Sequence, residues 1–199
     1  MEKSRGIVLG IGKPFRSYTT IFDYNHGRID IFSEQSSKKF LRGALLSYTS
    51  FSARQHIKIR DVFIEEAPLL LARSDLIFIH SLLELVHYSF PATYKCSDTF
   101  ELLWTILSIK ASKISLNVQV TAFARLLFLI GYFDEKVALH IDIFDYLLSL
   151  NPRDILREQL SISSYQQLAI WVDACLAAHP HKDNFNVIGI NSEAVRKKN

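Results

Sequence analysis

The chain has 199 residues, of which 49% are hydrophobic and 22% are charged, and this composition supports a folded core and excludes wholesale disorder. Its longest apolar stretch, near residues 126–133, is too short to cross a bilayer, and the chain does not begin with the apolar core of a signal peptide. Two cysteines, Cys96 and Cys175, are too few for a disulfide framework. We therefore expect a cytoplasmic protein with buried thiols.

Charge is distributed unevenly, and the basic part comes first. The net charge of +3 divides into +7 for residues 1–60, with 11 Lys and Arg against 4 Asp and Glu, and −4 for residues 61–199, with 12 against 16. Residues 37–60 alone contain seven basic side chains, counting His56, and no acidic one. This asymmetry predicts that the first part of the chain binds a polyanion.

The first 66 residues have the pattern of short strands. Segments rich in β-branched and aromatic residues lie at 6–13, 17–24, 28–34, 45–54 and 56–66. Asn25 and Gly27 accept positive φ and predict a turn between the second and third segments. Five strands in about 65 residues suit a small barrel, for which the OB-fold is the first choice and an SH3-like barrel is the main rival.

From residue 69 onward the apolar period becomes helical. Helices are predicted at residues 74–90, 97–109, 117–133, 141–150, after Asn151, and at 163–179, with Ser74, Asn117 and Asn151 as starting residues. A short strand-like segment follows at residues 186–190. The fold class is therefore expected to be α+β: an OB-fold nucleic-acid-binding domain over residues 1–68, followed by an all-α helical domain over residues 69–199. Because no flexible linker separates them, we expect the two domains to pack together.

The sequence contains no pattern typical of a catalytic centre. His80, Glu84 and His87 share a helical face, but such spacing is common, and a surface or domain-interface role is the expected one. The chain has no Cys-x-x-Cys pair, no nucleophile elbow and no phosphate-binding loop with a lysine. We expect a protein that is not an enzyme and has no cofactor and no bound metal.

The basic segment and its aromatic residues instead indicate nucleic-acid binding. Cations contact phosphates and aromatic rings stack on bases in barrels that bind single strands. The candidate cations are Arg16, Arg28, Lys38, Lys39, Arg42, Arg54, Lys58 and Arg60, and the candidate rings are Tyr18 and Tyr48. The alternative is a solvated loop over aromatic residues of the barrel core, and for Phe22 and Phe51 the core is the expected place.

Several motifs in chain order resemble the RecO family of bacterial recombination mediators. The matching residues are Gly6–Leu9, Thr20, Phe22, His26 and Gly27, followed by Leu41, Arg42, Gly43 and Leu45. The helical segments "FELLWTIL" (100–107) and "RLLFLIGY" (125–132) resemble two further family motifs. Many members carry a four-cysteine zinc site after the second of these segments, and this chain lacks those cysteines, so zinc is not carried over.

The resemblance implies an OB barrel with a helical domain, and a function in DNA repair and recombination. It also implies binding and annealing of single-stranded DNA, with double-stranded DNA as a further ligand, in the bacterial cytoplasm at the nucleoid. The implied partners are RecR and the acidic C-terminal tail of single-stranded-DNA-binding protein. Arg125, in the matching motif, is the candidate cation for that tail, and a buried helix-packing arginine is the alternative. The competing function is a protein–protein adaptor whose barrel does not bind DNA.

Overall fold

The computed structural model describes residues 2–11, 18–32, 40–53, 56–69, 75–110, 114–132, 141–157 and 160–182. Five strands come first and helices follow, which confirms the expected α+β arrangement. The predicted cap at Ser74 and the predicted strand at residues 186–190 lie outside the described residues. No helix in the described ranges is both long and apolar enough to cross a membrane.

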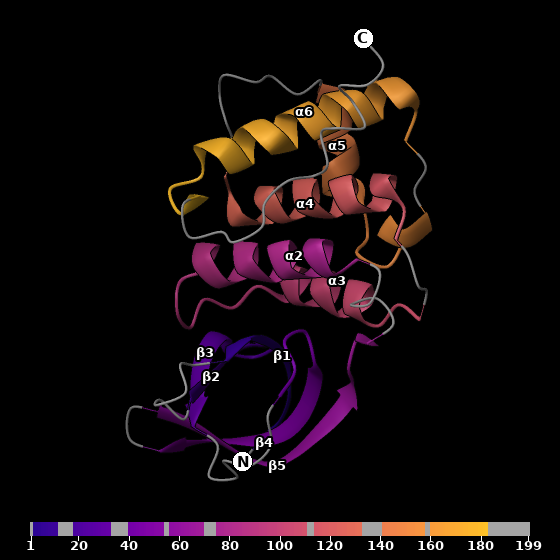
Figure 1. Ribbon diagram of the computed structural model, residues 1–199. Coiled ribbons are helices and arrows are strands. Elements are labelled where there is room, and N and C mark those ends of the chain that lie inside the picture. The colour runs from indigo at the N-terminus through magenta and orange to yellow at the C-terminus, as the bar shows by residue number, and fades with distance from the viewer. Residues whose placement is uncertain are drawn as a thin grey trace.

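The strands form one sheet that rolls on itself, seen nearly end-on in Figure 1. They are β1 (Glu2–Ile11), β2 (Tyr18–Asp23), β3 (Gly27–Phe32), β4 (Leu45–Ala53) and β5 (His56–Glu66). Their order is β1-β2-β3-β5-β4, and β4 pairs back with β1. All pairs are antiparallel except β3 with β5, which meet in parallel at the single residue pair Phe32–Lys58. We call this element the rolled sheet.

The position of β1 explains why apolar and polar residues alternate only loosely in its sequence. Val8 points to the inside of the rolled sheet, where it packs with Ile21 and Leu46. Its neighbours Ile7 and Leu9 point outward and pack against the helices. Because both faces of β1 are covered, both faces carry apolar residues, and the alternation typical of a half-exposed strand is lost.

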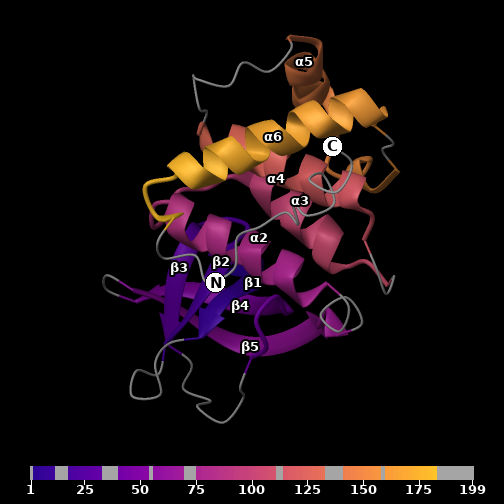
Figure 2. The same ribbon diagram turned by 45° about the horizontal axis from the view of Figure 1, so that its top comes forward.

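The helices lie on one side of the rolled sheet in layers, as Figures 1 and 2 show. They are α2 (Leu76–Ser89), α3 (Ser97–Leu107), α4 (Leu116–Ile130), α5 (Ile141–Ser149) and α6 (Ile162–Ala178). The helices α2 and α3 contact β1, and α4 packs between them and α6. The single layer of α2 and α3 therefore separates the sheet from the rest of the helical half.

The helices α3 and α5 begin at the predicted residues, Ser97 and Ile141, whereas α4 and α6 begin one residue earlier than predicted. At α4 the capping side chain is Ser115, whose hydroxyl accepts a hydrogen bond from the backbone N–H of Val118, and not Asn117. Asn151 starts only a turn and the short 3₁₀ helix Ile155–Arg157, although its side chain does accept from the N–H of Arg153. A serine hydroxyl and an asparagine side chain cap equally well, so composition alone does not choose between near neighbours.

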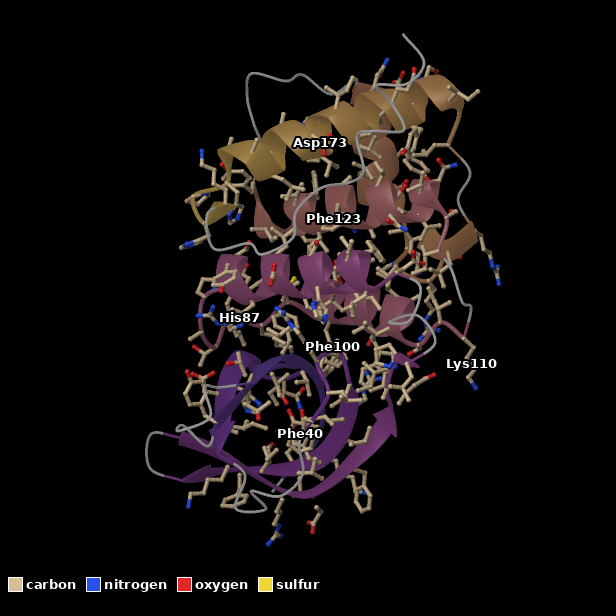
Figure 3. All side chains as sticks on the ribbon, viewed as in Figure 1. Phe40, His87, Phe100, Lys110, Phe123 and Asp173 are labelled. Carbon is tan, nitrogen blue, oxygen red and sulfur yellow. The ribbon has the colours of Figure 1, made fainter. Side chains whose placement is uncertain are left out.

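A shared core joins the sheet to the helices. Ile7, Leu9, Phe22 and Leu45 from the sheet belong to one apolar cluster with residues of all the helices that the structure describes. Phe100 lies between the rolled sheet and the helices in Figure 3 and stacks on Phe22 with ring centroids 6.5 Å apart. The two halves therefore form one packed body, as the absence of a linker predicts.

Candidate nucleic-acid interface

Arg28, one of the predicted phosphate contacts, lies at the junction of the rolled sheet with α2. Its guanidinium donates a hydrogen bond to the backbone oxygen of His87, in the last turn of α2. The last carbonyls of a helix lack intrahelical partners and carry the negative end of the helix dipole, so a cation is favourable there. Arg28 thus fixes the end of α2 to β3.

Arg42 is also engaged at this junction. Its Nε donates to the backbone oxygen of Leu9 at 2.6 Å, and its Nη1 lies 3.4 Å from the carboxylate of Glu84, which is buried on α2. A buried carboxylate requires a partner of opposite charge, and Arg42 supplies it. Arg28 and Arg42 therefore bind a helix carbonyl and a buried carboxylate of the chain itself, and neither belongs to an outward-facing basic surface.

Tyr48, a predicted stacking ring, lies inside the rolled sheet and is only 3% exposed. Its hydroxyl donates to Oδ2 of Asp23, a carboxylate that is 1% exposed and also accepts from the Ser4 hydroxyl at 2.7 Å. Burial, and then the negative charge of Asp23, raise the pKa of Tyr48 well above its ordinary value. The prediction that this ring stacks on a base is corrected, because the strands enclose it.

Two other predicted contacts, Lys58 and Arg60, lie exposed on the outer face of β5. The Arg60 guanidinium lies over the ring of Phe51 on β4, 5.9 Å from its centroid, and its Nε is 3.6 Å from Asp61. Tyr18 is half-buried at the start of β2 and lines a small pocket together with Arg28. Of the predicted set, Lys58 and Arg60 are the described cations on an exposed sheet surface.

The remaining predicted cations lie outside the described residues: Arg16, Lys38, Lys39 and Arg54. The strand ends that flank them in sequence do share one edge of the sheet. Tyr18 pairs with Phe32, Phe32 pairs with Lys58, and Ala53 pairs with His56 at that edge. Lys58 pairs with Phe32, the last described residue of β3, and so belongs to this edge.

The outer face of β1, β4 and β5 contains a groove that the sequence did not reveal. Strand register places Lys3 beside Thr49 and Thr49 beside Arg60, and it places Arg5 beside Ser47 and Ser47 beside Phe63. The middle strand thus carries small hydroxyl side chains while the flanking strands carry long ones. Those flanking strands are about 9–10 Å apart. The result is a groove of about 600 Å³, here called the β1–β4–β5 groove.

The walls of this groove carry complementary chemistry. Lys3 and Arg5 line it on β1, and Phe63 lines it on β5 with 66% of its surface exposed. An exposed aromatic ring beside cations is typical of surfaces that bind single strands. Sequence reasoning missed these residues. The signal that it overlooked is the alternation of Lys3 and Arg5 with Ser4 and Gly6.

Arg5 connects the groove to the helices. Its guanidinium lies over the rings of Tyr24 and Trp104, at 5.1 and 4.9 Å from their centroids, and its Nη2 is 3.1 Å from the carboxylate of Glu101 on α3. Cation–π contacts and a partly exposed ion pair hold the side chain in one place. Because Arg5 is held in place, the end of the groove next to α3 is a preformed site that could hold a phosphate.

Arg125, the candidate anchor for an acidic peptide, is buried at 7% exposure on α4. It donates a hydrogen bond to the backbone oxygen of Leu147 at the end of α5, and its guanidinium lies 5.8 Å from the ring centroid of Phe128. The alternative of a helix-packing arginine therefore describes it, and the expected surface role is corrected.

The histidines of α2 lie at the interface with the sheet, which agrees with the expected interface role. Burial, and then the nearby guanidinium groups, lower the pKa of His80 and of His87. Glu84, between them, pairs with Arg42. Over the described ranges, no three His, Cys, Asp or Glu side chains are placed to hold a metal ion, and the absence of zinc stays a prediction.

A comparison of the chain with models of known protein families finds no match, and a comparison with curated proteins finds none either.

Proposed function

We propose that this protein binds single-stranded DNA without catalysing a reaction, and that it acts as a recombination mediator of the kind that the RecO family represents. The observation that carries the proposal is the β1–β4–β5 groove, where Lys3 and Arg5 on β1 face the exposed ring of Phe63 on β5, with Lys58 and Arg60 exposed farther along β5. Phosphates are contacted by such cations, and each base stacked on an aromatic ring contributes about 1–3 kcal/mol. The motif resemblance supplies the biological context.

We further propose that the rolled sheet is an OB-fold barrel. The strand order β1-β2-β3-β5-β4, with β1 paired to β4, supports this assignment. OB-folds commonly bind ligands on the face of strands 2 and 3. Here Phe22 on that face packs into the helical core and Arg28 binds α2. These contacts favour the opposite side of the sheet, where the β1–β4–β5 groove lies, as the binding face.

The proposed partners RecR and the acidic tail of single-stranded-DNA-binding protein rest on the resemblance alone. Because Arg125 is buried, a docking site for the tail must use other cations of the chain. Binding of these partners is separable from the DNA-binding proposal.

The test compares two triple variants. In the first, Lys3, Lys58 and Arg60 become alanine. In the control, three exposed cations of the helical half, Lys110, Arg153 and Lys182, become alanine. Affinity for a labelled single strand is measured by fluorescence anisotropy at several salt concentrations. The first variant should bind more weakly and lose about 2 units of the salt slope, since each phosphate contact to a single strand contributes about 0.7.

The control variant carries the same loss of positive charge, but its cations lie in the helical half and not on the outer sheet surface, so it should keep the wild-type salt slope. Equal slopes for the two triple variants would show that net charge, and not the outer surface of the sheet, determines binding. No binding by the wild-type chain at low salt would favour the adaptor function.

A further inference from the structure

The β1–β4–β5 groove carries carboxylates as well as cations, and they lie on opposite sides. Lys3 and Arg5 line it from β1, whereas Asp61 and Glu65 line it from β5 together with Phe63. A surface that only attracted phosphates would gain nothing from two carboxylates, because they repel the backbone. Asp61 lies 3.6 Å from the Arg60 Nε, an exposed pair that leaves acceptor capacity on its carboxylate. Beside the exposed ring, both carboxylates can therefore accept from the donors of a ligand.

The position of Asp61 follows from an irregularity in β5. The register between β4 and β5 shifts between Ser47 and Thr49, and Asp61 has φ of +52°. A β-bulge of this kind re-aims the side chains of the bulged strand. Aspartate is among the residues that adopt a positive φ most readily. The bulge makes Asp61 part of the groove lining, in the row between Arg60 and Phe63.

Nucleobases offer both a flat surface that stacks on an aromatic ring and N–H donors that a carboxylate can accept from. A base stacked on Phe63 presents its edge in the plane of the ring. A carboxylate is an acceptor only, so it can bind a base edge that carries N–H donors. Cytosine presents its N4 amino group for such a contact, whereas uracil and thymine present the O4 acceptor at the same position.

We propose that Asp61 and Glu65 select bases that carry an exocyclic amino group, while Lys3 and Arg5 hold the phosphate backbone along β1. This inference rests on the proposed binding of single-stranded DNA in the same groove. Polarity across the groove sets the orientation of the strand: its backbone lies toward β1, and its bases turn toward β5. Uracil and thymine should be disfavoured in the groove because their O4 faces a carboxylate.

The experiment uses the full chain and two matched probes, oligo(dC) and oligo(dU) of about 12 nucleotides, a length within the range of single OB-fold sites. They differ at the base edge but not in backbone charge. Mildly alkaline pH keeps cytosine neutral. Wild-type protein should bind oligo(dC) about five- to tenfold more tightly than oligo(dU), as one carboxylate–amino contact at a partly solvated site allows.

The variants are Asp61→Asn and Glu65→Gln together, with Glu66→Gln as the control. Glu66 follows directly on β5 and does not line the groove. Amides carry donors that can bind O4, so the double variant should reduce the preference for oligo(dC) to less than about twofold. Glu66→Gln should keep it. Because asparagine also adopts positive φ, the double variant preserves the bulge.

Each outcome separates the two proposals. If both probes bind equally to the wild type, the base selection is refuted and DNA binding stands. If the double variant binds both probes more tightly by the same factor, the carboxylates act only by charge repulsion, and the base selection is again refuted. If neither probe binds, the proposed function itself fails.

Discussion

Removing the buried carboxylate of Asp23 should destabilise the fold more than any loss of a single exposed charge. Asp23 ends β2, is 1% exposed, and accepts hydrogen bonds from the hydroxyls of Ser4 and Tyr48. It also accepts from the backbone N–H groups of Asn25 and His26 at 2.8 and 2.7 Å. The Asp23→Ala variant removes both carboxylate oxygens, and with them all of these hydrogen bonds.

The magnitude follows from the burial of each donor. Ser4 and Tyr48 are buried, and an unsatisfied buried hydroxyl costs about 1–3 kcal/mol. The turn N–H groups belong to half-exposed residues, and water can replace part of what they lose. We expect a total loss of roughly 3–5 kcal/mol, which is a large share of the typical 5–15 kcal/mol of a domain. For a chain of this size the melting temperature should fall by roughly 6–20 °C.

The assay is urea denaturation followed by circular dichroism, with Asp30→Ala as the control. Asp30 lies on the same hairpin and is exposed, and it accepts one side-chain hydrogen bond, from the buried hydroxyl of Thr20. Its loss leaves one buried hydroxyl unsatisfied and should cost about 1–3 kcal/mol, less than Asp23→Ala. Asp23→Asn should cost less than Asp23→Ala. The hydroxyls of Ser4 and Tyr48 can rotate and accept from the new amide.

A double-mutant cycle with Tyr48→Phe isolates the contact. In wild type, Tyr48→Phe removes a satisfied hydroxyl and should destabilise. After Asp23→Ala, the same change removes an unsatisfied hydroxyl and should be neutral or stabilising, which gives a coupling of roughly 1–2 kcal/mol. Additivity within about 0.5 kcal/mol would refute the reasoning that the carboxylate satisfies this hydroxyl.

Two further predictions concern backbone conformation and pH. Gly27→Ala should lower the free energy of unfolding by roughly 1–3 kcal/mol more than Gly131→Ala in the same denaturation assay. Both glycines have positive φ, but an added Cβ at Gly27 would lie 2.0 Å from the Tyr94 oxygen, whereas one at Gly131 meets nothing within 4 Å. Equal costs would contradict this. The free energy of unfolding should fall as pH drops below about 7, because burial lowers the pKa of His179, so that the unfolded chain takes up the proton first. Measured at several pH values, His179→Gln should flatten this decline, and an unchanged slope would exclude His179 as a source.

The element types were predictable from the sequence because local patterns determine them. The strands β2 to β5 alternate or carry β-branched residues, and α2 to α6 show helical apolar stripes. The strand order and the face of the sheet that the helices cover were not predictable in this way. They depend on contacts between residues far apart in sequence, such as Phe22 with Phe100 and Arg42 with Glu84.

The candidate site was predictable only in part, because charge in a sequence does not say which cations already have partners. Lys58 and Arg60 point outward, as the basic segment suggested. Arg42 has the same charge but meets a carboxylate 42 residues later in the chain. Tyr48 was misplaced for a related reason: an aromatic residue in a strand is equally suited to either face, and only the register places it inside.

The basic first part of the chain thus performs two physical tasks. Arg28 and Arg42 bind the carbonyl end and the buried carboxylate of α2, so part of the positive charge offsets negative groups of the helical half. Lys3, Lys58 and Arg60 lie on the outer sheet surface, where a polyanion can reach them. Arg5 belongs to both groups, since it lines the β1–β4–β5 groove and pairs with Glu101 on α3. A phosphate at that end of the groove must share the guanidinium with Glu101, and so DNA bound there would act on the contact that joins the sheet to the helices.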